Sequence, residues 1–227
     1  MLQNKLLNKT LKVSKVTGLI LCAQFAASSV FAQTPINLKV DVWADNWFAL
    51  YVGDELVKED SVSIRTERSF NAESFNLRLS LPAQINFIVK DFKENDTGLE
   101  YIGSRKQQMG DGGFIAQFID TASGKPLLVT SEEWRCLPIH IAPLNKQCAK
   151  SSTPEMSCSH QIIEEPANWK SASFDDSKWP KAERFSKWTV RPKGGYDKVD
   201  WSYDANLIWS SDLEADNTLL CRASLTN

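Results

Sequence analysis

Apolar residues occupy every second position in two segments of the chain, 38–42 and 75–81. In the first segment Leu38, Val40 and Val42 alternate with Lys39 and Asp41. Because successive side chains of a strand point to opposite faces of a sheet, a period of two indicates a strand with one buried face. The second segment has the same pattern, with Phe75, Leu77, Leu79 and Leu81 as its apolar positions. Both segments are therefore predicted to be half-buried strands.

Further apolar runs predict strands along the rest of the chain. They are Phe48–Val52, Ile85–Phe92, Phe114–Ile119, Leu127–Thr130, Ile139–Ile141, Leu207–Trp209 and Thr218–Arg222. The segment Leu50–Val57 is typical of a hairpin, because Gly53 can adopt the positive φ that a type II′ turn requires at its first central position. His140 lies beside Ile139 and Ile141 and is expected to face solvent.

No segment keeps an apolar helical stripe for three turns, and only a short helix over Asp176–Ala182 is predicted, with an Asp or Ser as its cap. The polar segment from Cys148 to Asn168 is expected to be a long loop. Many short strands separated by turns predict an all-β fold, an antiparallel jelly-roll β-sandwich with long disulfide-stapled loops. Residues 33–227 are expected to form one such domain.

The first 32 residues have the pattern of a secretory signal peptide. Lysines without acids come first, an apolar stretch from Val16 to Ala27 follows, and Val30-Phe31-Ala32 has the small-x-small form of a cleavage site. The apolar run is shorter than the roughly 20 residues of a membrane-spanning helix. We therefore predict cleavage near Ala32, no membrane span, and a periplasmic or secreted mature protein.

The net charge of the chain limits the classes of partner that it is expected to bind. The signal segment contains four lysines and no acid, so its removal takes the formal net charge from −2 to −6. Nucleic acids bind basic surfaces through release of phosphate counterions, so an acidic chain does not favour a nucleic-acid partner.

Four cysteines follow the signal segment, namely Cys136, Cys148, Cys158 and Cys221. An even number in an exported chain predicts disulfides. Three pairings exist, and we favour Cys136 with Cys148 and Cys158 with Cys221. A zinc or copper site built from these cysteines with His140 and His160 is disfavoured, because it needs reduced thiolates at closer spacing.

Several segments carry a resemblance to a known superfamily. They are Trp43–Val52, Gly112–Phe118, Thr130–Trp134, Phe174–Pro180 within Trp169–Ala182, and Ala205–Trp209. In this order they resemble elements of the galactose-binding-domain-like β-sandwich superfamily, the jelly rolls that accompany many glycosidases. The resemblance implies a jelly roll and a non-catalytic binding role, with carbohydrate as the ligand class. One fold hosts many functions, so the role is inferred by analogy.

Eight tryptophans give the chain candidate sugar-stacking surfaces. The polar, Gly-bearing region near residue 195 is predicted to present a binding platform. Its candidate ligand-binding residues are Trp188, Arg191, Tyr196, Asp197, Asp200, Trp201 and Tyr203. Packing on the sandwich is the alternative for these aromatics, and it is the favoured one. Trp43, Trp134, Trp169, Trp179 and Trp209 lie within the superfamily-like segments and are expected in the core.

Two Asp-Asn pairs, Asp45-Asn46 and Asp216-Asn217, each follow an alanine just before a predicted strand. Their side chains can bond the backbone of a turn or donate oxygens to Ca²⁺. Calcium needs six to eight oxygen ligands and no EF-hand-like spacing supplies them, so turn chemistry is favoured and no cofactor is predicted. Asp175-Asp176-Ser177 is likewise expected to be a cap or a tight turn.

No catalytic residue is assigned. The sequence lacks a Gly-x-Ser-x-Gly elbow, and two histidines limit any Ser/His/Asp triad. We therefore expect an exported binding module for a carbohydrate or a cell-surface glycan. The alternative is a structural or protein-interaction component of the cell envelope that has a protein partner and no small ligand. Enzymatic activity is the least favoured class and stays open.

Overall fold

The predicted strands pair into two six-stranded antiparallel sheets in the computed structural model, which describes residues 34–226. The first sheet has the strand order β12 (Glu183–Phe185), β13 (Leu207–Trp209), β8 (Gly113–Asp120), β1 (Ile36–Asp45) and β4 (Ala72–Leu79). A sixth strand, β9 (Pro126–Val129), also pairs with β8. The predicted signal peptide lies outside the described residues, which belong to a single compact unit.

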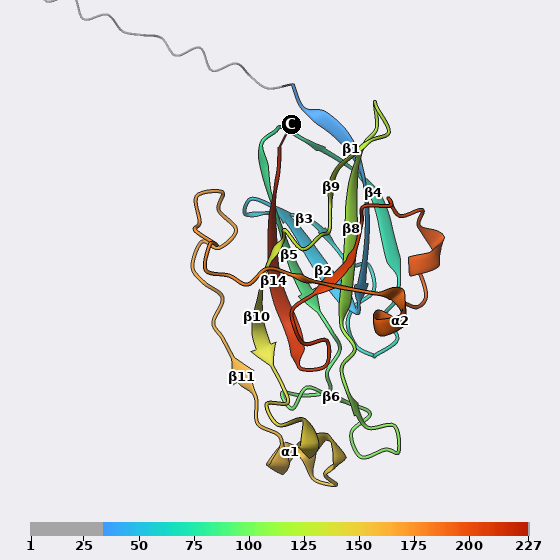
Figure 1. Ribbon diagram of the computed structural model, residues 1–227, viewed down its shortest axis with the longest axis vertical. Helices are drawn as coiled ribbons and strands as arrows, with labels where there is room; N and C mark the ends of the chain where they lie inside the picture. The colour runs from blue at the N-terminus through green and yellow to red at the C-terminus, as the bar shows by residue number, and fades with distance from the viewer. Residues whose placement is uncertain (1–33, 227) are drawn as a thin grey trace, which may run out of the picture. The chain divides into compact units, whose positions relative to one another are not determined.

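The second sheet has the order β11 (Gln161–Ile162), β10 (Arg135–Ile141), β14 (Asp216–Leu225), β5 (Ala83–Lys90), β2 (Trp47–Val52) and β3 (Glu55–Glu59). A separate hairpin joins β6 (Leu99–Glu100) to β7 (Gln108–Met109). All nine predicted strand segments overlap these strands, so the all-β antiparallel prediction is confirmed. Figure 1 shows the sheets face to face in a sandwich-like arrangement.

The β2–β3 hairpin has the predicted turn. Gly53 has φ of +56°, and Asp54 between it and β3 does not have a positive φ, as a type II′ turn requires. The predicted helix over 176–182 is wrong, because this segment forms turns. Its aspartates act locally instead: the Ser177 N–H donates to the Asp175 carboxylate over 3.0 Å, as the turn prediction expected.

The helices of the described residues are short. They are α1 (Pro154–Ser157), α2 (Lys187–Val190) and the 3-10 turns η1 (Lys146–Lys150) and η2 (Tyr196–Lys198). None of the helices within 34–226 has the length and apolar character of a bilayer-spanning segment.

The main core lies between the two sheets. Phe87 of β5 is at its centre, with its ring 4.8 Å from that of Phe114 and 5.9 Å from that of Trp134. The alternation of the sequence supplies this layer: Leu38, Val40 and Val42 point inward with no exposed surface. Burial of such side chains contributes roughly 25 cal/mol per Å² of apolar area.

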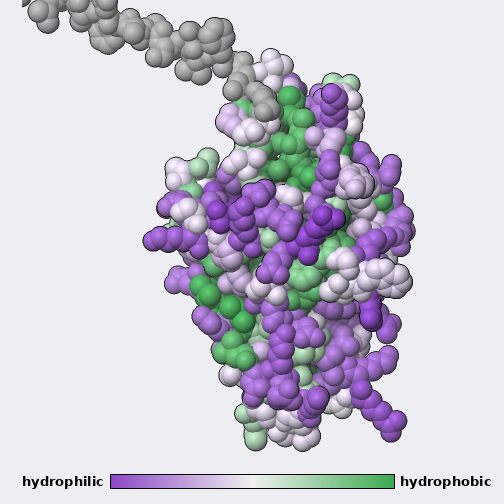
Figure 2. All heavy atoms as spheres, viewed as in Figure 1, coloured by the Kyte–Doolittle hydropathy of each residue, from purple (hydrophilic) through white to green (hydrophobic). Residues whose placement is uncertain are grey.

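The outer faces of both sheets are also covered. Trp43 and Ile115 on the first sheet pack against Val190 and Tyr196 of the 187–199 segment. Leu220 on the second sheet packs against Trp169 and Trp179. All five tryptophans predicted for the core are at most 7% exposed, which confirms that prediction. Polar side chains dominate the face seen in Figure 2, with apolar atoms gathered at its upper end and along one side.

Two disulfides are present, but the favoured pairing was wrong. Cys136 bonds Cys221, and Cys148 bonds Cys158. Cys136 and Cys221 are register partners on the neighbouring strands β10 and β14, so their side chains lie directly opposite each other. The second bond closes the loop that carries η1 and α1, as expected for a disulfide-stapled loop. The metal alternative for these thiols is excluded by their oxidation.

Candidate metal centre

Three aspartates that are distant in the sequence meet at one end of the two sheets. Asp45 is the last residue of β1, Asp91 directly follows β5, and Asp111 lies two residues before β8. The pairing of Asp45 with Gly113 across β1 and β8 places the first and third side by side. One carboxylate oxygen from each aspartate lies within 4.8 Å of the other two. We call this group the aspartate cluster; it lies at the end of the sheets near β6 (Figure 1).

Two members of the aspartate cluster are buried without partners. Asp45 is 0% and Asp91 3% exposed, and none of their four carboxylate oxygens accepts a hydrogen bond from the described residues. Buried polar groups are nearly always paired, and an unpaired buried charge is costly. The cluster therefore requires a proton or a cation.

Asn217 of β14 adds a fourth oxygen. Its amide group donates to the carbonyl oxygens of Ala142 (2.7 Å) and Ala215 (2.8 Å), which fixes the orientation of the side chain. The remaining Oδ1 atom is buried and has no partner within residues 34–226. The Asp91 N–H donates to the Asn217 carbonyl over 3.0 Å, so the backbones of the two residues are held together.

Gly110 gives these oxygens their space. A Cβ atom at this position would lie 1.8 Å from Asp91 Oδ2 and 3.7 Å from Asn217 Oδ1. Both oxygens therefore lie next to the space that a Cβ atom of residue 110 would fill. Any larger residue would collide with the Asp91 carboxylate.

The electrostatics of the cluster favour a positive occupant. Burial and the nearby Asp111 raise the pKa of Asp45 well above its usual value, and burial and Asp45 do the same for the pKa of Asp91. Burial and Asp111 also raise the pKa of Glu100 in β6 to about 7. Within the part of the chain that the structure describes, the one ammonium group in an ion pair with the cluster is that of Lys193, whose Nζ lies 3.5 Å from Asp111 Oδ2.

The donor set and its dimensions suit a hard divalent cation. All the candidate ligands are oxygens, which Ca²⁺ and Mg²⁺ prefer, whereas Zn²⁺ favours nitrogen and sulfur. Two oxygens bound at about 2.4 Å from one Ca²⁺ lie at most about 4.8 Å apart. The three carboxylate oxygens lie within this distance of one another, so one ion can contact all three. Mg²⁺ usually keeps several waters, so a set of buried protein oxygens suits Ca²⁺ better.

The cluster borders two cavities, because Asp111 lines both. One, which we call the Glu100 cavity, has a volume of about 390 Å³ and is lined by residues that include Glu67, Arg68, Phe70, Glu100, Tyr101 and Lys193. The other has a volume of about 400 Å³ and is lined on its far side by Lys146, Asp212 and Glu214. A cation held by the aspartates would thus have an open side.

Sequence reasoning recognised only part of this centre. The turn role expected for Asp45 is wrong for its side chain, since neither carboxylate oxygen bonds the backbone. Asn217 does make the expected local bond, to Ala215, but its Oδ1 atom points elsewhere. Asp91 and Asp111 carried no signal, because they are separated from Asp45 by long stretches and meet only through strand pairing.

The predicted sugar platform is divided by the structure. Trp188 is 88% and Tyr203 100% exposed. Tyr196 is buried, with its ring 5.6 Å from that of Trp43, and the Trp201 indole donates to the Tyr196 carbonyl over 3.0 Å. Tyr196 and Trp201 therefore pack on the first sheet, as predicted by the alternative that these aromatic side chains pack on the sandwich. The polar members lie around them. Arg191 ends α2, and Asp197 of η2 is paired to Lys187 over 3.2 Å. The Asp200 carbonyl accepts from Gln117 over 3.1 Å.

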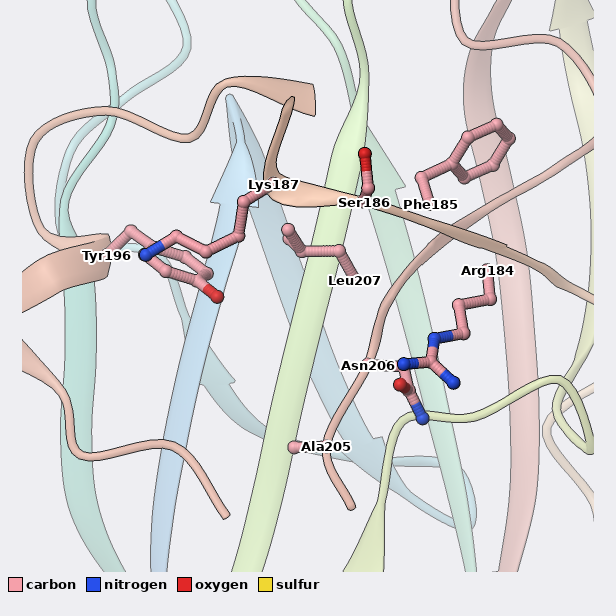
Figure 3. A pocket seen from close by; sticks show the side chains of 8 residues that line it. All are labelled: Arg184, Phe185, Ser186, Lys187, Tyr196, Ala205, Asn206 and Leu207. Atoms are coloured by element: carbon pink, nitrogen blue, oxygen red, sulfur yellow. The ribbon is translucent and has the colours of Figure 1, made fainter. Parts of the chain in front are cut away.

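A cavity of about 310 Å³ is lined by residues of the segments 184–187 and 205–207 and by Tyr196. In Figure 3 the Lys187 side chain runs beside the Tyr196 ring on one side, and Arg184 and Asn206 lie together on the other. The Lys187 ammonium is 4.7 Å from the centre of that ring. Trp188 follows Lys187, and Tyr203 comes two residues before Ala205, which also lines the cavity. The two exposed rings therefore emerge from the segments that form its wall.

His140 contradicts its predicted orientation. It is 6% exposed, because its ring stacks on that of His160 at 6.2 Å and its Nε2 atom lies 3.4 Å from Asp96 Oδ1. Burial lowers the pKa of His140 to about 4.

Comparison with known proteins adds no assignment. No family model matches the chain, and no curated protein or solved structure matches it either. Its function must therefore be argued from the geometry above.

Proposed function

We propose that this chain is an exported, non-catalytic binding protein whose aspartate cluster holds a divalent cation, with Ca²⁺ as the best fit. The observation that carries the proposal is the meeting of one carboxylate oxygen each from Asp45, Asp91 and Asp111 within 4.8 Å. Among residues 34–226, neither carboxylate of Asp45 or Asp91, nor Asn217 Oδ1, has a hydrogen-bond partner. Asp111 adds a carboxylate at the open side. Together these groups can supply most of the six to eight oxygens that Ca²⁺ binds, and water or a ligand supplies the rest.

The cation has a clear physical role in this proposal. Asp45 lies in a strand of the first sheet and Asp111 just before another, whereas Asn217 lies in a strand of the second sheet and Asp91 just after another. One ion bound to all four would join the two layers and neutralise charges that otherwise repel each other. The jelly-roll topology implied by the superfamily resemblance belongs to this proposal too, and the antiparallel two-layer arrangement supports it.

Calorimetric titration of the purified protein with CaCl₂, MgCl₂ and ZnCl₂ tests the proposal. We expect one Ca²⁺ per chain and tighter binding of Ca²⁺ than of the other two ions. At a hundredfold excess over the dissociation constant, binding adds about 2.7 kcal/mol to the free energy of unfolding. The thermal midpoint should then rise by roughly 5–10 °C relative to protein in EDTA.

Asp91→Asn is the decisive variant, because it keeps the shape of the side chain and removes one buried charge. We expect loss of the Ca²⁺-dependent rise in midpoint without loss of folding in EDTA. Asp54→Asn, in the exposed β2–β3 turn, is the matched control and should respond to Ca²⁺ like the wild type. Equal Ca²⁺ responses in both variants would refute the proposal.

Carbohydrate binding at the exposed aromatics is a second candidate function. Trp188 and Tyr203 are exposed and belong to segments that also line a cavity with Arg184 and Asn206 in its wall. This favours the candidate, since sugars stack on aromatic rings and bond adjacent polar groups. A glycan array with the wild type, Trp188→Ala and Tyr203→Ala tests this site, with the exposed Met156→Ala as control. A protein cross-linked at this surface, together with no glycan retained, would instead support the envelope-interaction alternative.

A further inference from the structure

The Glu100 cavity opens directly onto the proposed cation and has its own chemical character. Asp111 belongs both to the aspartate cluster and to the cavity wall. Asp45 and Asp91 are buried, so a cation bound to all three has its solvent side at Asp111. Ligand oxygens that enter the cavity from solvent can therefore reach the coordination positions that the protein leaves open.

The charges of the wall argue against an anionic ligand. Arg68 is paired with Glu67 at 3.2 Å, and Lys193 with Asp111 at 3.5 Å. Both basic side chains of the wall thus already face a carboxylate, and Glu100 adds a third acid. A phosphate or carboxylate would gain no free positive side chain and would meet three acids.

The same groups suit neutral hydroxyls. A hydroxyl can donate to a carboxylate and, through its oxygen, also bind a cation. Phe70 and Tyr101 provide apolar surface in the same wall. The cavity volume of about 390 Å³ is within the range of small-ligand sites.

We propose that the Glu100 cavity binds a neutral sugar residue, two hydroxyls of which complete the coordination of the cation, with Glu67 and Glu100 as hydrogen-bond acceptors. This inference rests on the proposed cation site. It places the sugar site away from Trp188 and Tyr203, at residues that the sequence did not single out.

Saturation-transfer NMR with methyl glycosides of galactose, mannose and glucose tests the proposal, with methyl glucuronide and inorganic phosphate as anionic probes. Each probe is titrated in CaCl₂ and in EDTA, and Ca²⁺ affinity is measured on the same samples. We expect at least one neutral glycoside to bind in CaCl₂, at least tenfold more weakly in EDTA, and no stronger binding of either anion.

Glu67→Gln separates the sugar site from the cation site, because Glu67 lines the cavity and is not in the aspartate cluster. We expect at least a threefold loss of glycoside affinity with unchanged Ca²⁺ affinity. The exposed Glu132→Gln is the matched control and should change neither.

The outcomes distinguish the two proposals. Ca²⁺ binding without binding of any neutral glycoside would overturn the sugar inference and leave the cation proposal standing. Absence of Ca²⁺ binding would overturn both. Glycoside binding that persists in EDTA, or that is lost in Trp188→Ala but not in Glu67→Gln, would assign the sugar to the aromatic surface. Preferred binding of methyl glucuronide or phosphate would overturn the neutral class.

Discussion

At the scale of single residues, this chain buries several ionisable side chains, and their burial lowers the stability of the fold. The carboxylates of Asp45 and Asp91 and the ring of His140 are all at most 6% exposed. Each has a pKa displaced towards its neutral form, and burial is the largest cause in each case. Burying such groups costs folding free energy, and groups with strongly shifted pKa values cluster at functional sites.

Gly110→Ala tests how closely the aspartate cluster is packed. The added methyl would meet Asp91 Oδ2 at 1.8 Å, so backbone or carboxylate must shift. We expect a loss of roughly 1–3 kcal/mol in the free energy of unfolding, as for other overpacked sites, and a weaker response to Ca²⁺. Urea denaturation with and without CaCl₂ measures both. Gly103→Ala is the control outside the cluster. Its positive φ strains an alanine, but nothing lies within 4 Å of the added methyl, so it should lose stability and keep the Ca²⁺ response of the wild type. An equal Ca²⁺ response in both variants would contradict the close packing.

His140 predicts a pH dependence with a defined sign. Folded His140 titrates at about 4, below its ordinary value of 6.5, so between these values the unfolded chain binds more protons. Stability should therefore fall as pH decreases from about 6.5 to about 4, by on the order of 2–3 kcal/mol from this group. Burial and Lys93 depress the pKa, His160 adds to this, and Asp96, 3.4 Å away, opposes it.

His140→Gln should flatten this dependence. Carboxyl groups also titrate in this pH range. The free energy of unfolding is therefore measured by urea denaturation at pH 7 and pH 4.5 for wild type and variant, and the two pH-dependent changes are compared. Identical pH dependences would show that His140 does not contribute.

At the scale of elements, strand pairing decides which distant residues meet. The two disulfides illustrate this. Cys136–Cys221 joins neighbouring strands across a separation of 85 residues, and Cys148–Cys158 closes a separation of only 10. On the chain-entropy model the first should contribute about 4–5 kcal/mol and the second about 3 kcal/mol.

Paired alanine variants compare the two bonds. We expect the Cys136→Ala/Cys221→Ala protein to lose more thermal stability than the Cys148→Ala/Cys158→Ala protein. Differential scanning calorimetry under non-reducing conditions provides the midpoints. An equal or larger loss from the loop bond would contradict the loop-closure explanation.

At the scale of the whole molecule, the aspartate cluster lies where both sheets end. Its members come from β1 and the residues adjoining β5 and β8, with Asn217 from β14. A cation at this position would act on both layers, whereas β3 is the edge strand of the second sheet and supplies none of these residues.

Hydrogen exchange can detect this coupling. On addition of CaCl₂ we expect slower exchange at residues 44–46, 90–92, 110–113 and 216–218 together, because the ion ties these segments to one another. Residues 55–59 of β3 should not change. Protection limited to one sheet would mean that the cation does not bridge the layers.

The sequence by itself determined the strands and their buried faces, because the period of two in side-chain direction is a local property. Leu38, Val40 and Val42 could be predicted from this period, and the five core tryptophans from their place in the superfamily-like segments. The even number of cysteines after the predicted signal peptide was also enough to predict that they would be oxidised.

Only the tertiary structure decided which side chains face each other across strands. The Cys136–Cys221 bond, the burial of His140 and the meeting of Asp45, Asp91 and Asp111 all depend on sheet order and register, which join segments distant in sequence. The division of the predicted sugar platform has the same origin: Tyr196 and Trp201 pack because the 187–201 segment folds back over Trp43, whereas Trp188 and Tyr203 stay exposed. Local pattern gives each strand its two faces, and long-range pairing alone determines which residues share a site.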